Sequence, residues 1–477
     1  AMALRVGMIS AGTRGDVQPF LALGQELQAR GHHVAICCPR LCVDLVHDHG
    51  IEAFGISYDP KAAILSPGMQ RAIGDGDGSG CVRAVCEAQR QQILETGIDP
   101  ADEVHSFMTE FRADVLVGHP SFVPLIVVAE AFSVPLVNAL FMPFLPSRVM
   151  QPGWYTQSQL EEEGFLNCPL QAHRHLWDQY INTDALKQLN EVRSRWGMQP
   201  YKDCSEVQAI YQSAPEANCW STHMLQAPSD LAQEFPLAQQ TGYLFADAPE
   251  HYELPAALLR FLENGQKPIY IGFGSLCVGD PRLATEKVLR ALMRAGQRGI
   301  ICGGWGGMNP EHLNPAETPD FAVLKQLLGV RLACALQSAG TVAAVARAGI
   351  PGAILPVAWD QPWWGEHLAK LKVGLNLGKM IASIDEDSLE TCFRSLSADS
   401  DLAERAAELG RLIRQETPGR QRLPHPWSTQ AQPVPKVTPA LWERPLKAVN
   451  SETAAGPPKP SGTIESWEEY PMKLGGA

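Results

Sequence analysis

The sequence stretch that decides the fold is LRVGMISAGTRGDVQPFLALGQELQARGHHVAICC, residues 4–38. Its apolar runs at residues 4–10 and 34–38 have the length and composition of buried strands. The residues between them, 17–30, are amphipathic with a helical period, and a glycine-bearing turn at residues 11–16 precedes them. A strand, a helix and a second strand in this order predict a parallel βαβ unit.

The same alternation of apolar runs and helical patterns recurs further along the chain. The later runs are VLVGH (115–119), VPLVNAL (134–140), PIYIGFGSL (268–276), GIICGG (299–304) and PGAILPV (351–357). Repeated strand–helix alternation predicts an α/β protein with doubly wound parallel sheets of the Rossmann-like kind. Ligands of such sheets bind outside the carboxyl ends of the strands, so we expect two such domains to face a cleft.

The length of 477 residues favours two domains over a single core. A turn-rich segment at residues 236–255 is the expected linker between an N-terminal domain, residues 4–235, and a C-terminal domain, residues 256–416. Residues 417–477 contain 11 of the 37 prolines and little periodicity, so we expect them to form a Pro-rich tail without a core of its own.

Composition and charge exclude several classes of function. The formal net charge of −13 offers no cationic surface for a phosphodiester backbone, so no nucleic-acid partner is expected. The 12 cysteines form no Cys-x-x-Cys pairs, which favours reduced thiols and a cytoplasmic location. The longest apolar run, residues 123–145, is interrupted by Glu130, Pro135 and Pro143, so no transmembrane segment is predicted.

Residues 12–34, GTRGDVQPFLALGQELQARGHHV, resemble the amino-terminal signature of the sterol and antibiotic glycosyltransferases, which have the GT-B fold. Further matches extend the resemblance over residues 4–416. They are ADVLVGHP (113–120), KPIYIGFGSL (267–276), GGWGG (303–307), AGTVAAVARAGIP (339–351) and PVAWDQPWWGE (356–366).

The resemblance implies an inverting transfer of a sugar to a hydroxyl group of a hydrophobic acceptor, such as a sterol or another natural product. The N-terminal domain would bind the acceptor, and the C-terminal domain would bind a nucleotide sugar, a UDP- or TDP-hexose, as co-substrate. No metal ion and no other cofactor are expected, since the sequence has no His/Asp/Glu cluster with ligand spacing.

On the acceptor side, the resemblance assigns Asp16 as the general base that takes the proton of the acceptor hydroxyl. An aspartate beside a helix start is also a good cap, and the sequence leaves both roles open. The resemblance further places Gly12, Arg14, Gly15 and His119 on this side.

On the donor side, Gly274 and Ser275 follow a predicted strand directly, as a loop that offers N–H groups to phosphate would. Asp360 and Gln361 match the pair that holds the sugar hydroxyls. The remaining donor-side residues predicted from the resemblance are Trp305, Ser338, Gly340 and Thr341.

The sequence departs from the family at the diphosphate. Where the family has His-His-Gly-Gly-Ala-Gly-Thr, residues 335–341 read ALQSAGT, so Leu336 replaces a histidine that would donate to a phosphate oxygen. The family's Val-Pro-His loop near the nucleotide aligns with Phe321, Ala322 and Val323.

The departure leaves two hypotheses for the function. The first is the glycosyltransferase described above. The second is a GT-B scaffold that serves as a cofactor-free cyclase, isomerase or hydrolase, or as a binding protein for a hydrophobic molecule, without a nucleotide sugar. Acceptor specificity would depend on residues 57–97 and 146–204, which we expect to be irregular.

Overall fold

The computed structural model describes residues 3–416, apart from short gaps. The gaps are residues 76–77, 144–146, 154, 181, 232–235, 248–252, 277–278, 306, 309–320, 325–332, 337–338 and 382. All described residues belong to one compact unit, residues 1–435. The predicted Pro-rich tail, residues 417–477, lies outside the described residues.

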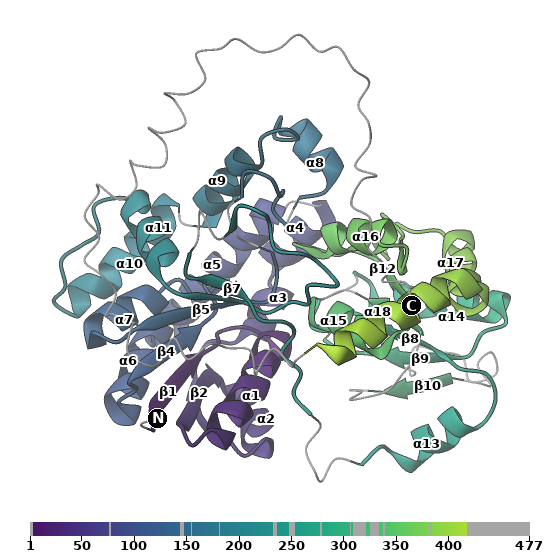
Figure 1. The fold of residues 1–477 in the computed structure, drawn as a ribbon, viewed down its shortest axis with the longest axis horizontal. Helices are drawn as coiled ribbons and strands as arrows, with labels where there is room; N and C mark the ends of the chain where they lie inside the picture. The colour runs from purple at the N-terminus through teal and green to yellow at the C-terminus, as the bar shows by residue number, and fades with distance from the viewer. Residues whose placement is uncertain are drawn as a thin grey trace, which may run out of the picture. The chain divides into compact units, whose positions relative to one another are not determined.

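The first sheet has seven parallel strands in the order β3-β2-β1-β4-β5-β6-β7 (Figure 1). Apolar side chains of β1, β2 and β4 pack against helix α1 and form its core. The order reverses on either side of β1, which places the carboxyl end of β1 at the switch point where such sheets bind ligands. The strands are β1 Arg5–Ile9, β2 His33–Pro39, β3 Glu52–Ile56, β4 Val115–Gly118, β5 Leu136–Leu140, β6 Glu216–Asn218 and β7 Ala238–Gln240.

The second sheet has six parallel strands in the order β10-β9-β8-β11-β12-β13. Its order also reverses, here on either side of β8. The strands are β8 Ile269–Gly272, β9 Gly299–Cys302, β10 Phe321–Leu324, β11 Ala333–Leu336, β12 Gly352–Ile354 and β13 Gly374–Asn376. Two parallel sheets with alternating helices confirm the predicted fold class.

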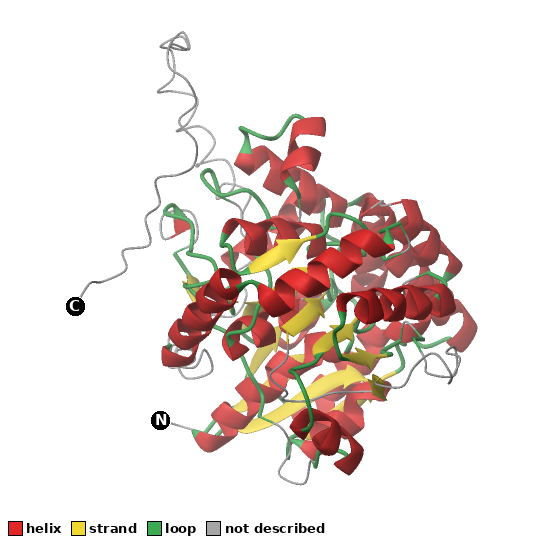
Figure 2. Ribbon diagram, turned by 90° about the vertical axis from the view of Figure 1, so that its right-hand side faces the viewer, coloured by secondary structure: helices red, strands yellow, loops and turns green. Residues whose placement is uncertain are grey.

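Helices connect the strands, and Figure 2 shows them outside the strands. Those of the first half are α1 Arg14–Ala29, η1 Arg40–Cys42, α2 Val43–Asp48, α3 Pro60–Leu65, α4 Pro67–Asp75, α5 Gly78–Thr96, α6 Pro100–Phe111, α7 Leu125–Phe132, α8 Gln157–Glu162, α9 Pro169–Tyr180, α10 Thr183–Arg195 and α11 Cys204–Ser213. Those of the second half are α13 Ala256–Glu263, α14 Pro281–Ala295, α15 Ala339–Ala348, α16 Gln361–Lys370, α17 Glu386–Ala398 and α18 Ser400–Gln415.

Three segments differ from what the sequence led us to expect. Residues 57–97, expected to be irregular, contain the helices α3, α4 and α5, and residues 146–204, also expected to be irregular, contain α8, α9 and α10. Helices α3–α5 are stabilised because their apolar side chains pack on residues of the second half of the chain, such as Leu276 and Val357. Local sequence patterns do not reveal such a contact. Strand β7 lies inside the predicted linker, residues 236–255, and pairs with β6 in the first sheet. The domain bounds themselves stay a prediction.

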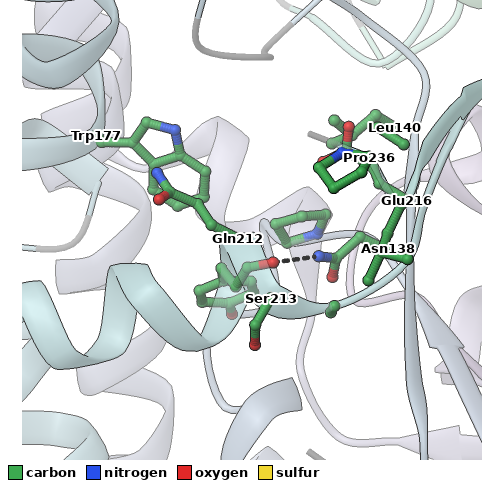
Figure 3. A pocket seen from close by; sticks show the side chains of 12 residues that line it. Asn138, Leu140, Trp177, Gln212, Ser213, Glu216 and Pro236 are labelled. Carbon is green, nitrogen blue, oxygen red and sulfur yellow. Dashed lines mark hydrogen bonds between the residues drawn. The ribbon is translucent and has the colours of Figure 1, made fainter. Parts of the chain in front are cut away.

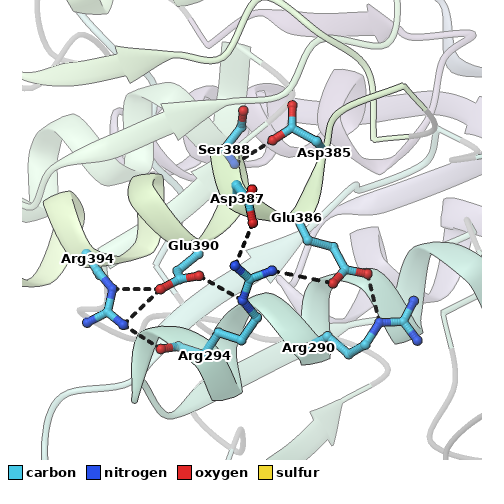
Figure 4. A network of polar contacts seen from close by, with 8 residues as sticks. All are labelled: Arg290, Arg294, Asp385, Glu386, Asp387, Ser388, Glu390 and Arg394. Carbon is cyan, nitrogen blue, oxygen red and sulfur yellow. Dashed lines mark hydrogen bonds and ion pairs between the residues drawn. The ribbon is translucent and has the colours of Figure 1, made fainter.

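Ion pairs at the surface connect helices α14 and α17. Figure 4 shows Arg290 and Arg294 of α14 facing the acidic side chains of α17. Arg290 Nε lies 2.8 Å from Glu386, and Arg294 Nε lies 2.8 Å from Glu390. The arginine side chains are exposed and the glutamate side chains are half-buried at the surface, so each pair contributes at most about 1 kcal/mol to folding. The apolar core beneath, which includes Leu289 and Phe393, does more to hold the helices.

Candidate active site

Asp16 lies in the first turn of α1, directly after the loop that leaves β1. Its Oδ2 accepts hydrogen bonds from the backbone N–H of Thr13, at 2.6 Å, and from the Thr13 hydroxyl, at 3.1 Å. Thr13 and Asp16 together form a capping box. The cap that the sequence suggested is therefore present, and it uses Oδ2. A role as general base requires only Oδ1 and stays a prediction.

The surroundings of Asp16 make its carboxylate more basic than usual. Burial raises the pKa of Asp16 above its ordinary value, while the hydrogen bonds from Thr13 oppose this shift. A carboxylate with a raised pKa takes a proton more readily, which is the property that a general base needs.

Gly12 permits the position of this carboxylate. A Cβ atom on Gly12 would lie 2.1 Å from Asp16 Oδ2, closer than any real contact. Gly15 is different, because a Cβ there would meet only Thr13 Oγ1 at 3.7 Å. The structure thus explains Gly12, but not Gly15, by a close approach of the Asp16 carboxylate.

Arg14 is the first residue of α1. Burial and the charge of Asp16 raise the pKa of nearby Cys42, the charge of Arg14 opposes this shift, and the resulting pKa is about 11.

His119 follows β4, whose last residue pairs with the end of β1. Its Nδ1 accepts from the Ser121 backbone N–H at 3.1 Å and lies 2.8 Å from the Ser121 hydroxyl. Burial lowers the pKa of His119 to about 4, so the ring is neutral at pH 7 with its proton on Nε2. The ring stacks on Phe141, which contacts Phe20 one turn after Asp16. Aromatic contacts thus link His119 to the helix of Asp16.

In the second sheet, the loops after β8 and β9 lie backbone against backbone. Trp305 N–H donates to the Gly274 carbonyl at 3.0 Å, and a Cβ on Gly304 would lie 2.1 Å from the same oxygen. Gly274 has a φ of +58°, which favours glycine, and it is exposed. The adjacent Ser275 is half-buried. The structure therefore brings the predicted Gly274, Ser275 and Trp305 together.

Asp360 and Gln361 are both buried, 6% and 3% exposed, and both are engaged in the fold of their own segment. Asp360 Oδ2 accepts from Trp364 Nε1 at 2.7 Å. Gln361 Oε1 accepts from Val357 N–H at 2.7 Å and from Ala358 N–H at 3.4 Å. A substrate would thus have to use the other atoms, Asp360 Oδ1 and Gln361 Nε2.

Two features mark this segment as unusual. Trp359, just before Asp360, has a φ of +57°, a conformation that costs a bulky residue about 1–3 kcal/mol and that clusters at functional sites. Burial, together with a smaller contribution from the charge of Asp16, raises the pKa of Asp360 to about 6. The predicted acceptor and donor sides are therefore electrostatically connected.

Helix α15 begins beside the altered diphosphate motif. Leu336 is the last residue of β11, and Ser338 lies outside the described residues. Gly340 is exposed, with open space where a Cβ would stand, and Thr341 is half-buried. No side chain therefore stands at position 340, in the first helical turn, where the N-terminus of a helix favours an anion.

Sequence reasoning missed an apolar cluster between the two halves of the chain. Ile64, Met69 and Ile73 of α3 and α4 pack with Leu276 and Val357, which follow strands of the second sheet. Trp305 and Trp359 pack against the same cluster. Helices α3–α5 therefore cover apolar side chains beside the predicted donor loops. The signal was the apolar spacing within residues 57–97.

The family matches agree with this geometry. Residues 6–151 match the glycosyltransferase family 28 N-terminal domain. The chain is 31% identical over 388 residues to the sterol 3-beta-glucosyltransferase UGT80A2 of Arabidopsis thaliana, covering 78% of this chain and 57% of the relative. Over most of its length the chain is therefore similar to sterol 3-beta-glucosyltransferases.

A second Arabidopsis relative, UGT80B1, is 28% identical over 431 residues, with 87% of this chain and 66% of the relative covered. The chain therefore spans less than two thirds of the length of either relative. The stretch that matches the family 28 domain contains Asp16 and His119, two of the residues predicted for the acceptor side.

Solved structures show that the chain has the GT-B fold. The glycotransferase of kitacinnamycin has a TM-score of 0.59 at 16% identity, covering 88% of this chain and 97% of that one. The glycosyltransferase VinC, solved in complex with DTDP, has a TM-score of 0.54 at 13% identity, covering 86% and 96%. At these identities the likeness concerns the fold alone.

No helix in the described ranges is long and apolar enough to span a membrane. Within the same residues, no three His, Cys, Asp or Glu side chains come together as a metal site would need. The expectation that no metal is required stays a prediction.

Proposed function

We propose that this protein is an inverting glycosyltransferase that moves a sugar from a nucleotide sugar to the hydroxyl of a hydrophobic, sterol-like acceptor. The names of the curated relatives support the class of acceptor. The observation that carries the proposal is Asp16, a carboxylate with a raised pKa held at the switch point of the first sheet.

In the proposed reaction, Asp16 Oδ1 takes the proton of the acceptor hydroxyl while the hydroxyl oxygen attacks the anomeric carbon. The new C–O bond forms on one face of the sugar as the bond to the diphosphate breaks on the other, so the anomeric centre inverts. Thr13 holds the other oxygen of Asp16 and keeps the base oriented.

On the donor side, the departing diphosphate would lie at the first turn of α15 and the loop of Gly274 and Ser275. Asp360 Oδ1 and Gln361 Nε2 are the atoms available to sugar hydroxyls, since Asp360 Oδ2 and Gln361 Oε1 accept hydrogen bonds within the fold. This donor site lacks the family's histidines, so we expect it to bind nucleotide weakly.

The experiment is a transfer assay with radiolabelled UDP-glucose or TDP-glucose and cholesterol, followed by extraction of the glycosylated product. Wild-type protein should form product, and Asp16→Asn should not. Asp48→Asn, which changes an exposed aspartate on α2, is the matched control and should retain full activity. Product formed equally by Asp16→Asn would remove Asp16 as the base.

A second function is favoured by two observations on the donor side. The histidines of the diphosphate motif are replaced, and an apolar cluster with α3 and α4 borders the donor loops. An acid/base enzyme or binding protein without a nucleotide sugar would account for both. Titration calorimetry with UDP and TDP decides between the two, because no heat at millimolar nucleotide supports the second function. Micromolar binding that weakens in Asp360→Ala supports the first.

A further inference from the structure

A cavity of about 250 Å³ lies against the first sheet. Its floor is formed by Asn138 and Leu140 of β5 and Glu216 of β6, and its walls by residues of α9 and α11 (Figure 3). Asp16, His119 and Asp360 do not line it.

Two aromatic side chains form part of the cavity wall. Trp177 of α9 and Tyr211 of α11 lie with ring centroids 5.8 Å apart and both border the space. Figure 3 shows Trp177 on one side of the cavity and Glu216 and Asn138 on the other. An aromatic wall opposite a carboxyl group is an arrangement that binds organic cations, through the faces of the rings and the charge of the carboxylate.

Glu216 is a carboxyl group without a cation beside it. Among the described residues that line the cavity there is no Lys or Arg, and Glu216 Oε1 accepts only a bond from Asn218 Nδ2 at 3.2 Å. Burial raises the pKa of Glu216 to about 8. Asn138 is 2% exposed, and its Oδ1 has no hydrogen-bond partner in the described structure.

Two other titratable groups near Glu216, Tyr211 and Cys219, provide no positive charge to pair with it. The Tyr211 hydroxyl donates to the Val123 carbonyl at 2.9 Å, and burial raises the pKa of Tyr211. Burial raises the pKa of Cys219 to about 12. Both groups are therefore neutral at pH 7, and a cation would have to come from a ligand.

The size of the cavity limits that ligand. An apolar cavity of about 150 Å³ holds benzene, so about 250 Å³ has room for one ring and a short side chain. A tetracyclic sterol is too large for it. We propose that this cavity is a binding site for a small arylalkyl ammonium compound, whose ring packs between Trp177 and the sheet and whose cation pairs with Glu216.

The test is titration calorimetry of the full-length protein with 2-phenylethylamine, using 2-phenylethanol as the uncharged isostere. At pH 7 the amine should bind at least tenfold more tightly than the alcohol. Because Glu216 must lose its proton to pair with the ammonium, amine binding should release a proton, which appears as a buffer-dependent heat. Equal affinity of the two compounds would overturn the proposal.

Two variants locate the site. Glu216→Gln keeps the shape and the acceptor for Asn218, so it should weaken amine binding at least tenfold, abolish proton release and leave alcohol binding unchanged. Ala238→Phe should fill the cavity and prevent binding of both compounds, whereas Ala403→Phe, on the exposed face of α18, should leave both unaffected. Unchanged amine binding by Ala238→Phe would place the amine elsewhere and refute the site. Should Glu216→Gln fail to fold, the amine–alcohol comparison and Ala238→Phe still decide.

Discussion

Asp16 and Asp360 are both carboxylates with raised pKa values, one from each sheet, yet they are held in different ways. Asp16 is held by the backbone and hydroxyl of Thr13, three residues away in its own loop. Asp360 is held by the indole of Trp364, which is itself buried in the core. Hydrogen bonds within its own loop therefore position Asp16, whereas the position of Asp360 depends on the packing of Trp364 in α16.

The largest expected effect concerns the first of these carboxylates. Asp16→Asn removes the proposed base while the amide oxygen can still accept the bonds from Thr13. We expect kcat/KM to fall by about 10²- to 10⁴-fold, with little change in melting temperature. Asp48→Asn is the matched control. A fall in melting temperature that parallels the loss of activity would show that Asp16 acts mainly as a cap.

The second effect concerns Asp360 and the dependence of stability on pH. Burial raises its folded pKa from 3.8 to about 6, so its contribution to stability is full below pH 3.8 and is lost as the pH rises through 6. A shift of this size corresponds to about 3 kcal/mol at neutral pH. Asp360→Asn, which keeps an acceptor for Trp364, should be more stable than wild type above pH 6 and should lack this slope. Urea unfolding between pH 4 and 8 measures the difference.

The same unfolding series tests whether Asp360 is protonated in the folded protein. An unchanged slope in Asp360→Asn would mean that Asp360 is ionised in the folded protein at all these pH values. The same series on Asp48→Asn, an exposed site, should reproduce the wild-type curve.

A third, smaller effect tests the space around Asp16. In Gly12→Ala the new Cβ would overlap Asp16 Oδ2, so the carboxylate must move, and we expect a loss of about 1–3 kcal/mol in folding stability. Activity should fall with it, because the base is displaced. Gly15→Ala, with a contact of 3.7 Å, should lose much less of both. Equal losses in the two variants would contradict a special role for Gly12.

The smallest expected effect is a gain in affinity for the nucleotide. Leu336→His restores the histidine that the family has before α15, and one hydrogen bond to a charged phosphate contributes about 1.5–3 kcal/mol. We expect UDP to bind about tenfold more tightly, measured by calorimetry. Leu336→Asn is the control for a polar side chain without an imidazole. No gain in affinity would indicate that the loss of this histidine is not what weakens the donor site.

Much of the fold could be predicted from the sequence. The apolar runs around residues 4–38 predicted β1, α1 and β2, because strand and helix periods are local properties. The motif GTRGD placed Asp16 at the end of the first strand, and the structure has it in the first turn of α1. Helices α3–α5 and α8–α10 were not predicted. For α3–α5 the reason is that their apolar side chains pack against residues about 200–300 positions away in the sequence.

The candidate site was predictable only in part. Asp16, Gly12 and His119 were found through their motifs, and the structure shows what holds each of them. The engagement of Asp360 with Trp364 and of Gln361 with its own loop could not be read from the motif, since it depends on side-chain direction. The roles assigned to these residues stay predictions.

Local sequence patterns were sufficient to predict the two parallel sheets, the loop that carries Asp16 and the absence of the family's diphosphate histidines, because periodicity, glycine spacing and residue type are properties of a few neighbouring residues. The packing of α3 and α4 beside the predicted donor loops and the burial of Asp360 against Trp364 became evident only in three dimensions. The same holds for Glu216, which lines a cavity that has no Lys or Arg among its described lining residues. These features arise where segments distant in the sequence meet, and burial then sets their pKa values.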